Sequence, residues 1–279
     1  MMKNKSTGFA DNPVVENPWR RLREFTDARI GLGRAGVSLP TNELLEFQLS
    51  HARARDAVHF PLDFEGLVSA IESSAGIPVT DIHRLQSRAD DRMTYLQRPD
   101  LGRRLHSHSR EILQHDLATD GEVAGEYDLS IVVVDGLSSL AVQQNVVPFL
   151  ETLLPQLNDF SLAPLCVVEQ GRVAVGDEVG ELLNARCVML LIGERPGLSS
   201  PDSLGLYLTY QPHVGLTDAA RNCISNIRPA GLSYVEAARR AAYLLNESRR
   251  LRLSGVNLKD RTQDDVVETV SGNKNFLIS

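Results

Sequence analysis

The chain has 279 residues, 42% of them hydrophobic and 23% charged, which suits one large globular domain or two smaller ones. Its formal net charge of −7 excludes a general nucleic-acid binder, because contact with the phosphate backbone requires a positive field. Three cysteines without paired spacing exclude a disulfide framework and a structural zinc site. The N-terminus lacks the apolar run of a signal peptide, and the longest apolar stretch, residues 188–192, is too short to span a bilayer. We therefore expect a soluble cytoplasmic protein with no membrane contact.

The first part of the chain is polar at its start and then shows helical patterns. Residues 1–16 contain Asn12-Pro13 and are expected to form a flexible tail. Pro18 after Asn17 predicts a helix start, and Thr41 is expected to cap a helix that reaches about residue 55. Further helices are expected over residues 64–71 and 103–117. Residues 17–124 are thus predicted to be a helical N-terminal region.

From residue 125 onward the pattern changes to strands that alternate with helices. Residues 128–135, 163–169 and 187–193 have the short apolar runs of buried parallel strands, and residues 204–210 form a weaker one. Helices are expected over residues 140–154, 179–183 and 234–251. The alternation predicts an α/β domain over residues 125–279, with a doubly wound, mostly parallel, Rossmann-like sheet. Ligands of such sheets bind beyond the carboxyl ends of the strands.

The glycines of Gly31-Leu-Gly33-Arg-Ala-Gly36 have the spacing of a dinucleotide fingerprint. That fingerprint must follow a strand and open a helix, whereas this one follows a helical pattern and leads to Pro40. We interpret it as a helix end and a tight turn. His106 and His108 lie two apart on a predicted helix and so on different faces, which makes metal ligation by this pair improbable.

Three polar, glycine-rich segments lie where the predicted sheet would bind a ligand: residues 168–174, 193–200 and 221–229. Each alone is typical of an ordinary turn, and Cys223 of a small buried residue. Because all three are expected at one edge of the sheet, together they favour a ligand site. A nucleophilic role for Cys223 is not expected, since no base stands near it in the motif.

The chain resembles a known family, the small subunit of ethanolamine ammonia-lyase, from about residue 17 to the end of the last helix. The resemblance is carried by residues 25–36, 44–58 and 95–104. Its most specific motifs are Gly-Glu-Arg-Pro-Gly-Leu at residues 193–198 and Asn-Cys-Ile-Ser-Asn-Ile-Arg-Pro at residues 222–229.

The resemblance implies one half of a two-protein carbon–nitrogen lyase, which converts ethanolamine to acetaldehyde and ammonia by radical chemistry of adenosylcobalamin. In the family a large subunit binds ethanolamine and carries the catalytic side chains, so no catalytic residue and no metal ligand is expected here. Cobalamin lies at the subunit interface, and by motif its contacts on this subunit are Val173, Glu194 and Cys223. The family assembles as six copies of each subunit and is often enclosed in a bacterial microcompartment. Residues 17–124 are expected to contact the large subunit, and residues 125–279 the cobalamin.

The lower ligand of cobalt is a separate expectation. Some cobalamin proteins place a histidine on cobalt from the motif D-x-H-x-x-G, and Asp81-Ile-His83-Arg-Leu-Gln86 departs from it at Gln86. We therefore expect cobalamin to keep its own dimethylbenzimidazole on the metal.

Two other classes of function stay open. A standalone α/β module could bind a nucleotide or flavin at the same edge, but the required phosphate-cradling turn is matched only in part by residues 135–139. A pure interaction protein without a ligand is the third interpretation.

Overall fold

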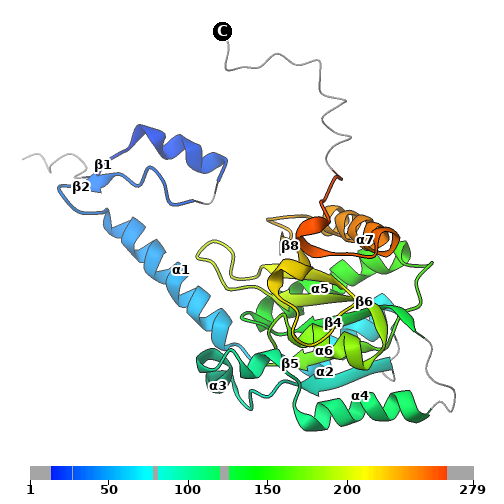
Figure 1. Ribbon diagram of the computed structural model, residues 1–279. Coiled ribbons are helices and arrows are strands. Elements are labelled where there is room, and N and C mark those ends of the chain that lie inside the picture. Colours follow the sequence, from blue (N-terminus) through cyan, green and yellow to red (C-terminus); the bar gives the residue numbers. More distant parts are fainter. Residues whose placement is uncertain (1–13, 27, 78–80, 120–125, 263–279) are drawn as a thin grey trace, which may run out of the picture. The chain divides into compact units, whose positions relative to one another are not determined.

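The computed structural model describes residues 14–26, 28–77, 81–119 and 126–262 (Figure 1). By their contacts the residues form two units. The first contains residues up to 56 together with 197–200, and the second contains residues 57–196 and 201–279. The expected tail falls outside the described residues up to residue 13. The division at residue 125, between a part expected to contact the large subunit and a part expected to contact cobalamin, stays a prediction.

The first unit has little secondary structure besides one long helix. The short strands β1 (Val14–Val15) and β2 (Arg34–Ala35) pair antiparallel, so residues 14–15 are not part of a tail. Pro18–Glu24 form the 3₁₀ helix η1, whose start is fixed by the Asn17 side chain accepting the Trp19 N–H at 3.0 Å. Helix α1 (Thr41–His59) already includes Thr41, and the Pro40 carbonyl accepts the Leu44 N–H at 3.1 Å. The cap therefore lies one residue earlier than expected.

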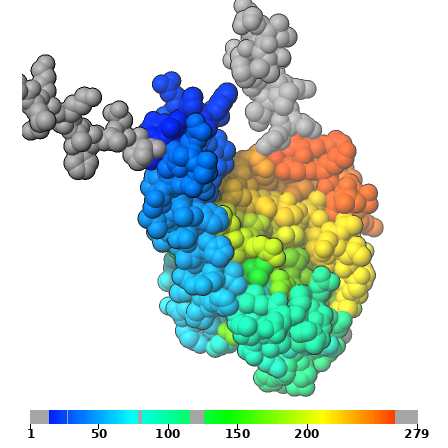
Figure 2. All heavy atoms as spheres, turned by 90° about the vertical axis from the view of Figure 1, so that its left-hand side faces the viewer, coloured from blue at the N-terminus to red at the C-terminus, as the bar shows by residue number. Residues whose placement is uncertain are grey.

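Side chains of the first unit are mostly exposed. Among residues 14–26 and 28–56 only Pro40 and Glu43 are buried. Glu43 binds the guanidinium groups of Arg20 at 3.0 Å and Arg23 at 3.1 Å, so the burial of its charge is compensated. The space-filling view draws this unit in blue (Figure 2). Most of its large apolar side chains, Trp19 and Phe25 among them, are exposed.

The three glycines of the false fingerprint lie around β2. Gly31, Gly33 and Gly36 have φ angles of 61°, 76° and 62°, in the left-handed region that glycine adopts without a steric penalty. No strand–turn–helix unit surrounds them, because β2 lies between Gly33 and Gly36 and α1 begins only at Thr41. The prediction of a tight turn is confirmed, whereas the predicted helix end is wrong, because η1 ends at Glu24, well before Gly31.

The second unit is built on a six-stranded sheet in the order β3-β5-β4-β6-β7-β8. Its strands are β3 (Ile82–Gln86), β4 (Tyr127–Val134), β5 (Leu165–Glu169), β6 (Ala185–Gly193), β7 (Leu204–Tyr210) and β8 (Arg221–Ile227). The first four in spatial order are parallel, while β7 and β8 each pair antiparallel with their neighbour. A mixed α/β domain with a mostly parallel sheet is thereby confirmed.

The helices pack on the sheet through two separate hydrophobic clusters of side chains. The first contains side chains of α2 (Phe64–Ala70), η2 (Ile71–Ala75), α5 (Ser139–Leu153) and α7 (Tyr234–Leu251), and the second those of α4 (Ser107–Thr119) and α6 (Val175–Leu182). Strand β4 contributes Ile131 and Val133 to the first cluster and Val132 and Val134 to the second. Because successive side chains of a strand point to opposite faces, the continuous apolar run of β4 is buried on both sides.

Two strands of the sheet were not expected. Residues 82–86, placed in the helical region, form the edge strand β3, and residues 221–227, taken as a loop, form the edge strand β8. An edge strand pairs through its backbone on one side only, and partial exposure of its side chains removes the apolar run that identifies an inner strand. The starts of α4 at Ser107 and α6 at Val175 each differ from the expected start by four residues, whereas α7 has the expected bounds. None of the helices in the described segments is long and apolar enough to cross a membrane.

Candidate functional site

An open cavity of about 390 Å³ lies beyond the carboxyl ends of β5 and β6. Its lining consists of Tyr95, Leu137, Arg172, Val173, Ile192, Gly193, Glu194, Arg195 and Tyr207. Of the three residues expected to contact a ligand, Val173 and Glu194 line this cavity and Cys223 does not. Two loops that lie apart in the sequence are thus brought together at the edge where the sheet predicts a site.

Cys223 lies beside the cavity, within β8 rather than in a loop. It is directly opposite Tyr207 of β7, so both side chains are on the same face of the sheet. Tyr207 forms part of the cavity lining, which places the exposed thiol next to that wall. Desolvation raises the pKa of the Cys223 thiol, and its side-chain partners are the hydroxyl groups of Tyr207 and Ser225. Without a base among these partners, the thiol stays protonated and is not an activated nucleophile.

Glu194 is held in place by three donors. Its carboxylate accepts hydrogen bonds from the Ser225 hydroxyl at 2.8 Å, from the Asn226 N–H at 3.2 Å and from the Ser203 hydroxyl. A Cβ on Gly205 would lie 2.9 Å from Oε1 of Glu194, so the glycine makes room for the carboxylate. In the described part of the chain these partners, and not Arg195, orient Glu194. A carboxylate can accept about four hydrogen bonds, which leaves it capacity for a ligand donor.

Tyr95 and Arg172 were not singled out from the sequence. Tyr95 belongs to the short helix α3 (Arg92–Gln97), and two guanidinium groups lie over its ring, that of Arg92 at 4.8 Å and that of Arg172 at 4.1 Å from the centroid. Burial raises the pKa of Tyr95, so its hydroxyl is a proton-bearing donor. No local pattern could have revealed this contact, because the two residues are far apart in the sequence. The only available signal was the Gly171-Arg172 pair in a predicted edge loop.

Asp135, at the end of β4, fixes the loop that carries Arg172 and Val173. The buried carboxylate accepts the Gly171 N–H at 3.2 Å and lies 3.6 Å from the Arg92 guanidinium. Arg92 also donates to the Gly136 carbonyl at 2.7 Å. Burial raises the pKa of Asp135 to about 6, while the charge of Arg92 acts in the opposite direction. The ends of β4 and β5 and the start of α3 are therefore bound into one rigid support.

The turn after β4 does not fit a nucleotide phosphate. Leu137 N–H donates to the Gly193 carbonyl at 2.9 Å, and the Ser138 hydroxyl accepts the Ala141 N–H at 3.2 Å. A Cβ on Gly193 would lie 2.0 Å from the Ser138 carbonyl oxygen, so the turn and the end of β6 are in close contact. Two N–H donors that could bind a phosphate, those of Leu137 and Ala141, are thus already used within the chain, which argues against the nucleotide-binding alternative.

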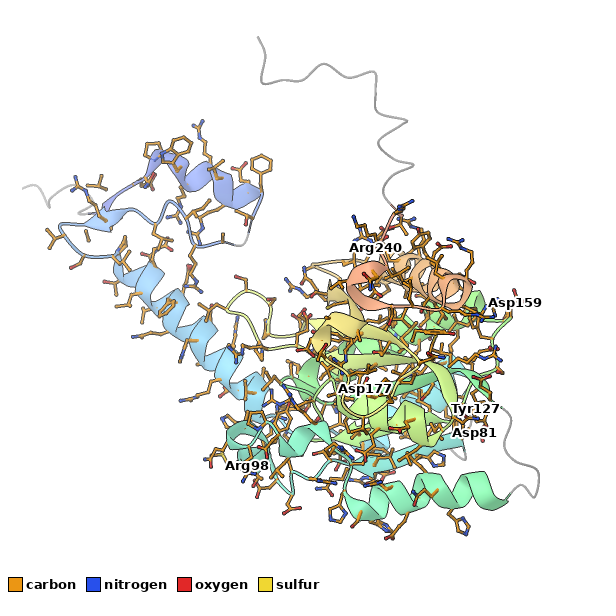
Figure 3. All side chains as sticks on the ribbon, in the orientation of Figure 1. Asp81, Arg98, Tyr127, Asp159, Asp177 and Arg240 are labelled. Atoms are coloured by element: carbon orange, nitrogen blue, oxygen red, sulfur yellow. The ribbon has the colours of Figure 1, made fainter. Side chains whose placement is uncertain are left out.

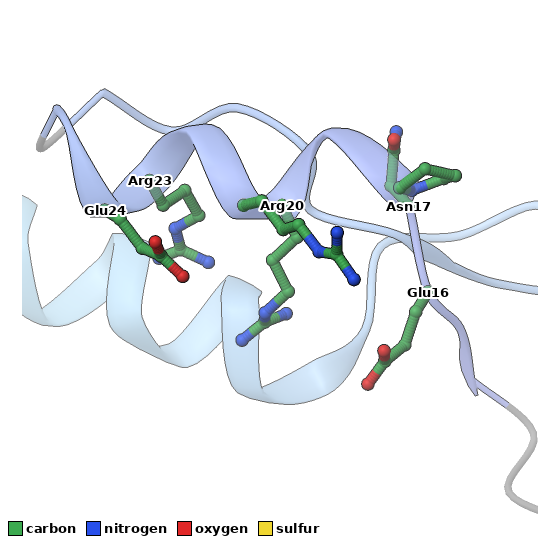
Figure 4. A pocket seen from close by; sticks show the side chains of 7 residues that line it. Glu16, Asn17, Arg20, Arg23 and Glu24 are labelled. Carbon is green, nitrogen blue, oxygen red and sulfur yellow. The ribbon is translucent and has the colours of Figure 1, made fainter.

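Other cavities lie elsewhere, and two of them contain several charged side chains. One, of about 510 Å³, is lined by Asp177 and Asp218 among other residues; Asp177, labelled in Figure 3, is ion-paired with the buried Arg221. The other, of about 660 Å³, belongs to the first unit and is shown in Figure 4, where Arg20 and Arg23 line it together with Glu16 and Glu24. Within the described segments no three His, Cys, Asp or Glu side chains gather as ligands for a metal ion.

Comparison with known proteins identifies the family. Residues 16–259 match the family model described as ethanolamine ammonia-lyase light chain (EutC). The ethanolamine ammonia-lyase small subunit of Azotobacter vinelandii is 56% identical over 270 residues, which cover 96% of this chain and 97% of that protein. The small subunits of Pseudomonas fluorescens SBW25 and Pseudomonas putida GB-1 are 54% and 55% identical over 272 residues each, covering 95% of this chain and 95% and 97% of those proteins. The chain therefore belongs to the ethanolamine ammonia-lyase small-subunit family and is part of a carbon–nitrogen lyase.

Proposed function

We propose that this chain is the non-catalytic, cobalamin-holding subunit of an ethanolamine ammonia-lyase and forms the cofactor site together with a large catalytic subunit. The observation that carries the proposal is the meeting of Val173 and Glu194 in one cavity, with Cys223 beside its Tyr207 wall. By motif, these three residues correspond to the family's cobalamin contacts.

The lining of the cavity fits a corrin ring with amide side chains. Leu137, Val173 and Ile192 offer apolar surface to the macrocycle, and Glu194 offers an acceptor to amide N–H groups. Two observations support the interpretation of the sheet as doubly wound and Rossmann-like. The helices contribute core side chains to two separate clusters, and the cavity lies at the carboxyl ends of the strands. An open cavity of about 390 Å³ receives one edge of so large a ring, and the remaining surface is left to the partner subunit.

The task of these residues is to hold and orient the cofactor. Adenosylcobalamin, when bound, supplies the hydrogen-abstracting chemistry, and the protein excludes water and side reactions. Glu194 is fixed from three sides and can therefore orient an amide donor with little loss of side-chain entropy. Burial and desolvation raise the pKa values of Tyr95, Tyr207 and Cys223, so none of them gives up a proton near neutral pH. This arrangement suits binding and not proton transfer.

The first unit is proposed to dock on the large subunit. Trp19 is 68% and Phe25 84% exposed, and they belong to a larger set of exposed apolar side chains that also includes Val15, Leu22, Val37, Leu39, Leu44, Leu45, Phe47 and Leu49. A soluble chain rarely leaves so much apolar surface in water unless a partner covers it. As the resemblance implies, the enzyme is proposed to assemble from six copies of each subunit and to be enclosed in a bacterial microcompartment.

The proposal is tested by visible spectra of adenosylcobalamin mixed with this chain, with the large subunit and with both. We expect the bound spectrum and ethanolamine turnover only when both subunits are present. A nucleotide- or flavin-binding module would take up its own ligand as a single chain. If the two subunits form a complex that leaves the cobalamin spectrum unchanged, the chain is an interaction protein without a cofactor and the proposal is wrong.

A further inference from the structure

Two residues of the cavity lining each carry a hydrogen-bond donor that has no acceptor in the described part of the chain. Tyr95 is fully buried, and neither its hydroxyl nor Nε of Arg172 has a hydrogen-bond partner among the described residues. Both residues line the cavity. A desolvated donor without a partner destabilises a protein, so a native structure that keeps two at one place needs a reason for them.

Both donors are held rigidly in place. Arg172 donates from its guanidinium to the Tyr95 carbonyl at 3.2 Å and from its backbone N–H to the Gly102 carbonyl at 2.7 Å. A Cβ on Gly102 would lie 2.9 Å from Cγ of Arg172 and 3.2 Å from Cδ2 of Tyr95, so the glycine permits this close packing. The donors are therefore arranged before any ligand binds, which reduces the entropy lost on binding.

The cavity also indicates which chemical group the donors would take. Tyr95 and Arg172 require an acceptor oxygen, whereas Glu194, in the same lining, requires a donor. A primary amide supplies both a carbonyl oxygen and N–H protons. A phosphate would satisfy Tyr95 and Arg172 but would bring its negative charge close to Glu194.

We propose that Tyr95 Oη and Arg172 Nε form a carbonyl-binding subsite, which accepts the oxygen of an amide side chain of the corrin ring. This inference rests on the proposed function and extends the cofactor site to two residues that the resemblance does not name as cobalamin contacts. Tyr95 acts here as a binding residue through its hydroxyl, and the contacts of its ring with Arg92 and Arg172 keep that hydroxyl in position.

Tyr95→Phe is the direct test, because it removes the hydroxyl and keeps the ring. Adenosylcobalamin titrated into the two-subunit enzyme should bind about tenfold more weakly. The melting temperature of the variant without cofactor should be unchanged or higher, since an unsatisfied buried donor is removed. Arg172→Lys, which keeps the charge but lacks Nε–H, should also weaken binding.

Tyr234→Phe is the matched control. The Tyr234 hydroxyl donates to Oδ1 of Asn145 at 2.7 Å and lies outside the cavity lining. Its loss should lower the melting temperature and leave the dissociation constant of cobalamin unchanged. If Tyr95→Phe behaves like this control, the Tyr95 hydroxyl has a structural role and the subsite does not exist.

Cobinamide distinguishes the two possible sources of the oxygen, because it keeps the ring amides and lacks the nucleotide phosphodiester. Equal weakening of cobinamide and cobalamin binding by Tyr95→Phe supports the carbonyl assignment, and weakening of cobalamin alone overturns it in favour of the phosphodiester. If wild-type enzyme binds cobalamin and Tyr95→Phe binds it equally well, only the subsite is wrong. If the wild-type enzyme does not bind cobalamin, the proposed function fails and the subsite fails with it.

Discussion

The carboxylate of Glu194, just past the end of β6, accepts a hydrogen bond from the hydroxyl of Ser225 on β8, 2.8 Å away. Between these two strands lies β7, where Gly205 leaves the space that the carboxylate crosses. A residue expected only to hold a cofactor thus also connects the end of a parallel strand with the antiparallel edge of the sheet. Its substitution should have two separate effects.

Glu194→Ala should weaken adenosylcobalamin binding to the two-subunit enzyme by roughly 10- to 100-fold, because a charge-assisted hydrogen bond to a corrin amide is lost. It should also lower the free energy of unfolding by about 1–3 kcal/mol, since three donors lose their acceptor. Glu194→Gln, which keeps an acceptor oxygen but no charge, should lie between. At saturating cofactor kcat should change little.

Ser225→Ala separates these two effects, because it removes one donor and leaves the carboxylate in place. A modest loss of stability is expected, with a dissociation constant within about threefold of wild type. Unchanged cobalamin affinity in Glu194→Ala would remove Glu194 from the cofactor site and leave it a purely structural link. Spectroscopic titration and melting curves of the enzyme without cofactor measure both quantities.

The purified chain should release neither acetaldehyde nor ammonia from ethanolamine, with or without adenosylcobalamin. Its cavity offers groups that bind and orient, and the pKa values of Tyr95 and Tyr207 in the lining and of Cys223 beside it are raised. A coupled alcohol dehydrogenase assay detects acetaldehyde, with the two-subunit enzyme as the positive control. Turnover by the single chain at any rate above that of the free cofactor would contradict a non-catalytic subunit.

Cobalamin should keep dimethylbenzimidazole on cobalt. His83 lies on a strand, although residues 17–124 were predicted to be helical. It is the second residue of β3 and pairs in register with Cys166. At roughly 3.3 Å per residue it lies about 10 Å from the carboxyl end of its strand, away from the edge that carries the cavity. Electron paramagnetic resonance of holoenzyme containing ¹⁵N-histidine tests this. A cobalt superhyperfine pattern that changes with the label would show that a protein histidine has replaced the base.

The stability of the sheet unit should depend on pH through Asp135. Burial raises its pKa to about 6, so between about pH 4 and 6 the native state binds a proton that the unfolded chain does not. The resulting stabilisation is complete below about pH 4 and is lost as the pH rises through 6. Relative to Asp135→Asn, wild-type protein should therefore lose ~3 kcal/mol of unfolding free energy between pH 4 and 7.

Urea denaturation at several pH values measures this difference. Relative to Asp177→Asn, wild-type protein should also lose stability as the pH rises, because burial raises the pKa of Asp177 to about 6 despite its ion pair with Arg221. Asp159→Asn, the same substitution at an exposed position, should leave the wild-type profile in place. If the unfolding free energies of Asp135→Asn and wild type change with pH in parallel, Asp135 has the same pKa in the folded and unfolded states and the prediction is wrong.

Much of the sheet could be predicted because its inner strands are buried on both faces. β4 and β6 have continuous apolar runs, and α7 has a Ser233 cap and a broad apolar face, so their positions follow from local sequence. The edge strands β3 and β8 lack this signal. In β8 buried and exposed residues alternate irregularly, and its conformation depends on pairing with β7, which no local pattern reveals.

The site could be predicted only in part, for the same physical reason. Val173 and Glu194 follow recognisable strands, and parallel strands bring their carboxyl ends to one edge, so their meeting follows from topology. Tyr95 reaches the cavity from α3, a helix of one and a half turns whose start is set by Asp91 accepting the Thr94 N–H at 2.8 Å. A helix this short has no periodicity from which its direction or its neighbours could be inferred.

Of the three cysteines, Cys166 and Cys187 are buried and Cys223 is exposed. A maleimide or haloacetamide reagent will therefore modify the unmutated protein at one place, and mildly alkaline solution will favour the reaction because the thiol pKa is raised. A fluorophore at this position would sit across from Tyr207, at the wall of the cavity. The natural sequence thus carries its own attachment point for following ligand arrival and subunit assembly by fluorescence, without cysteine engineering.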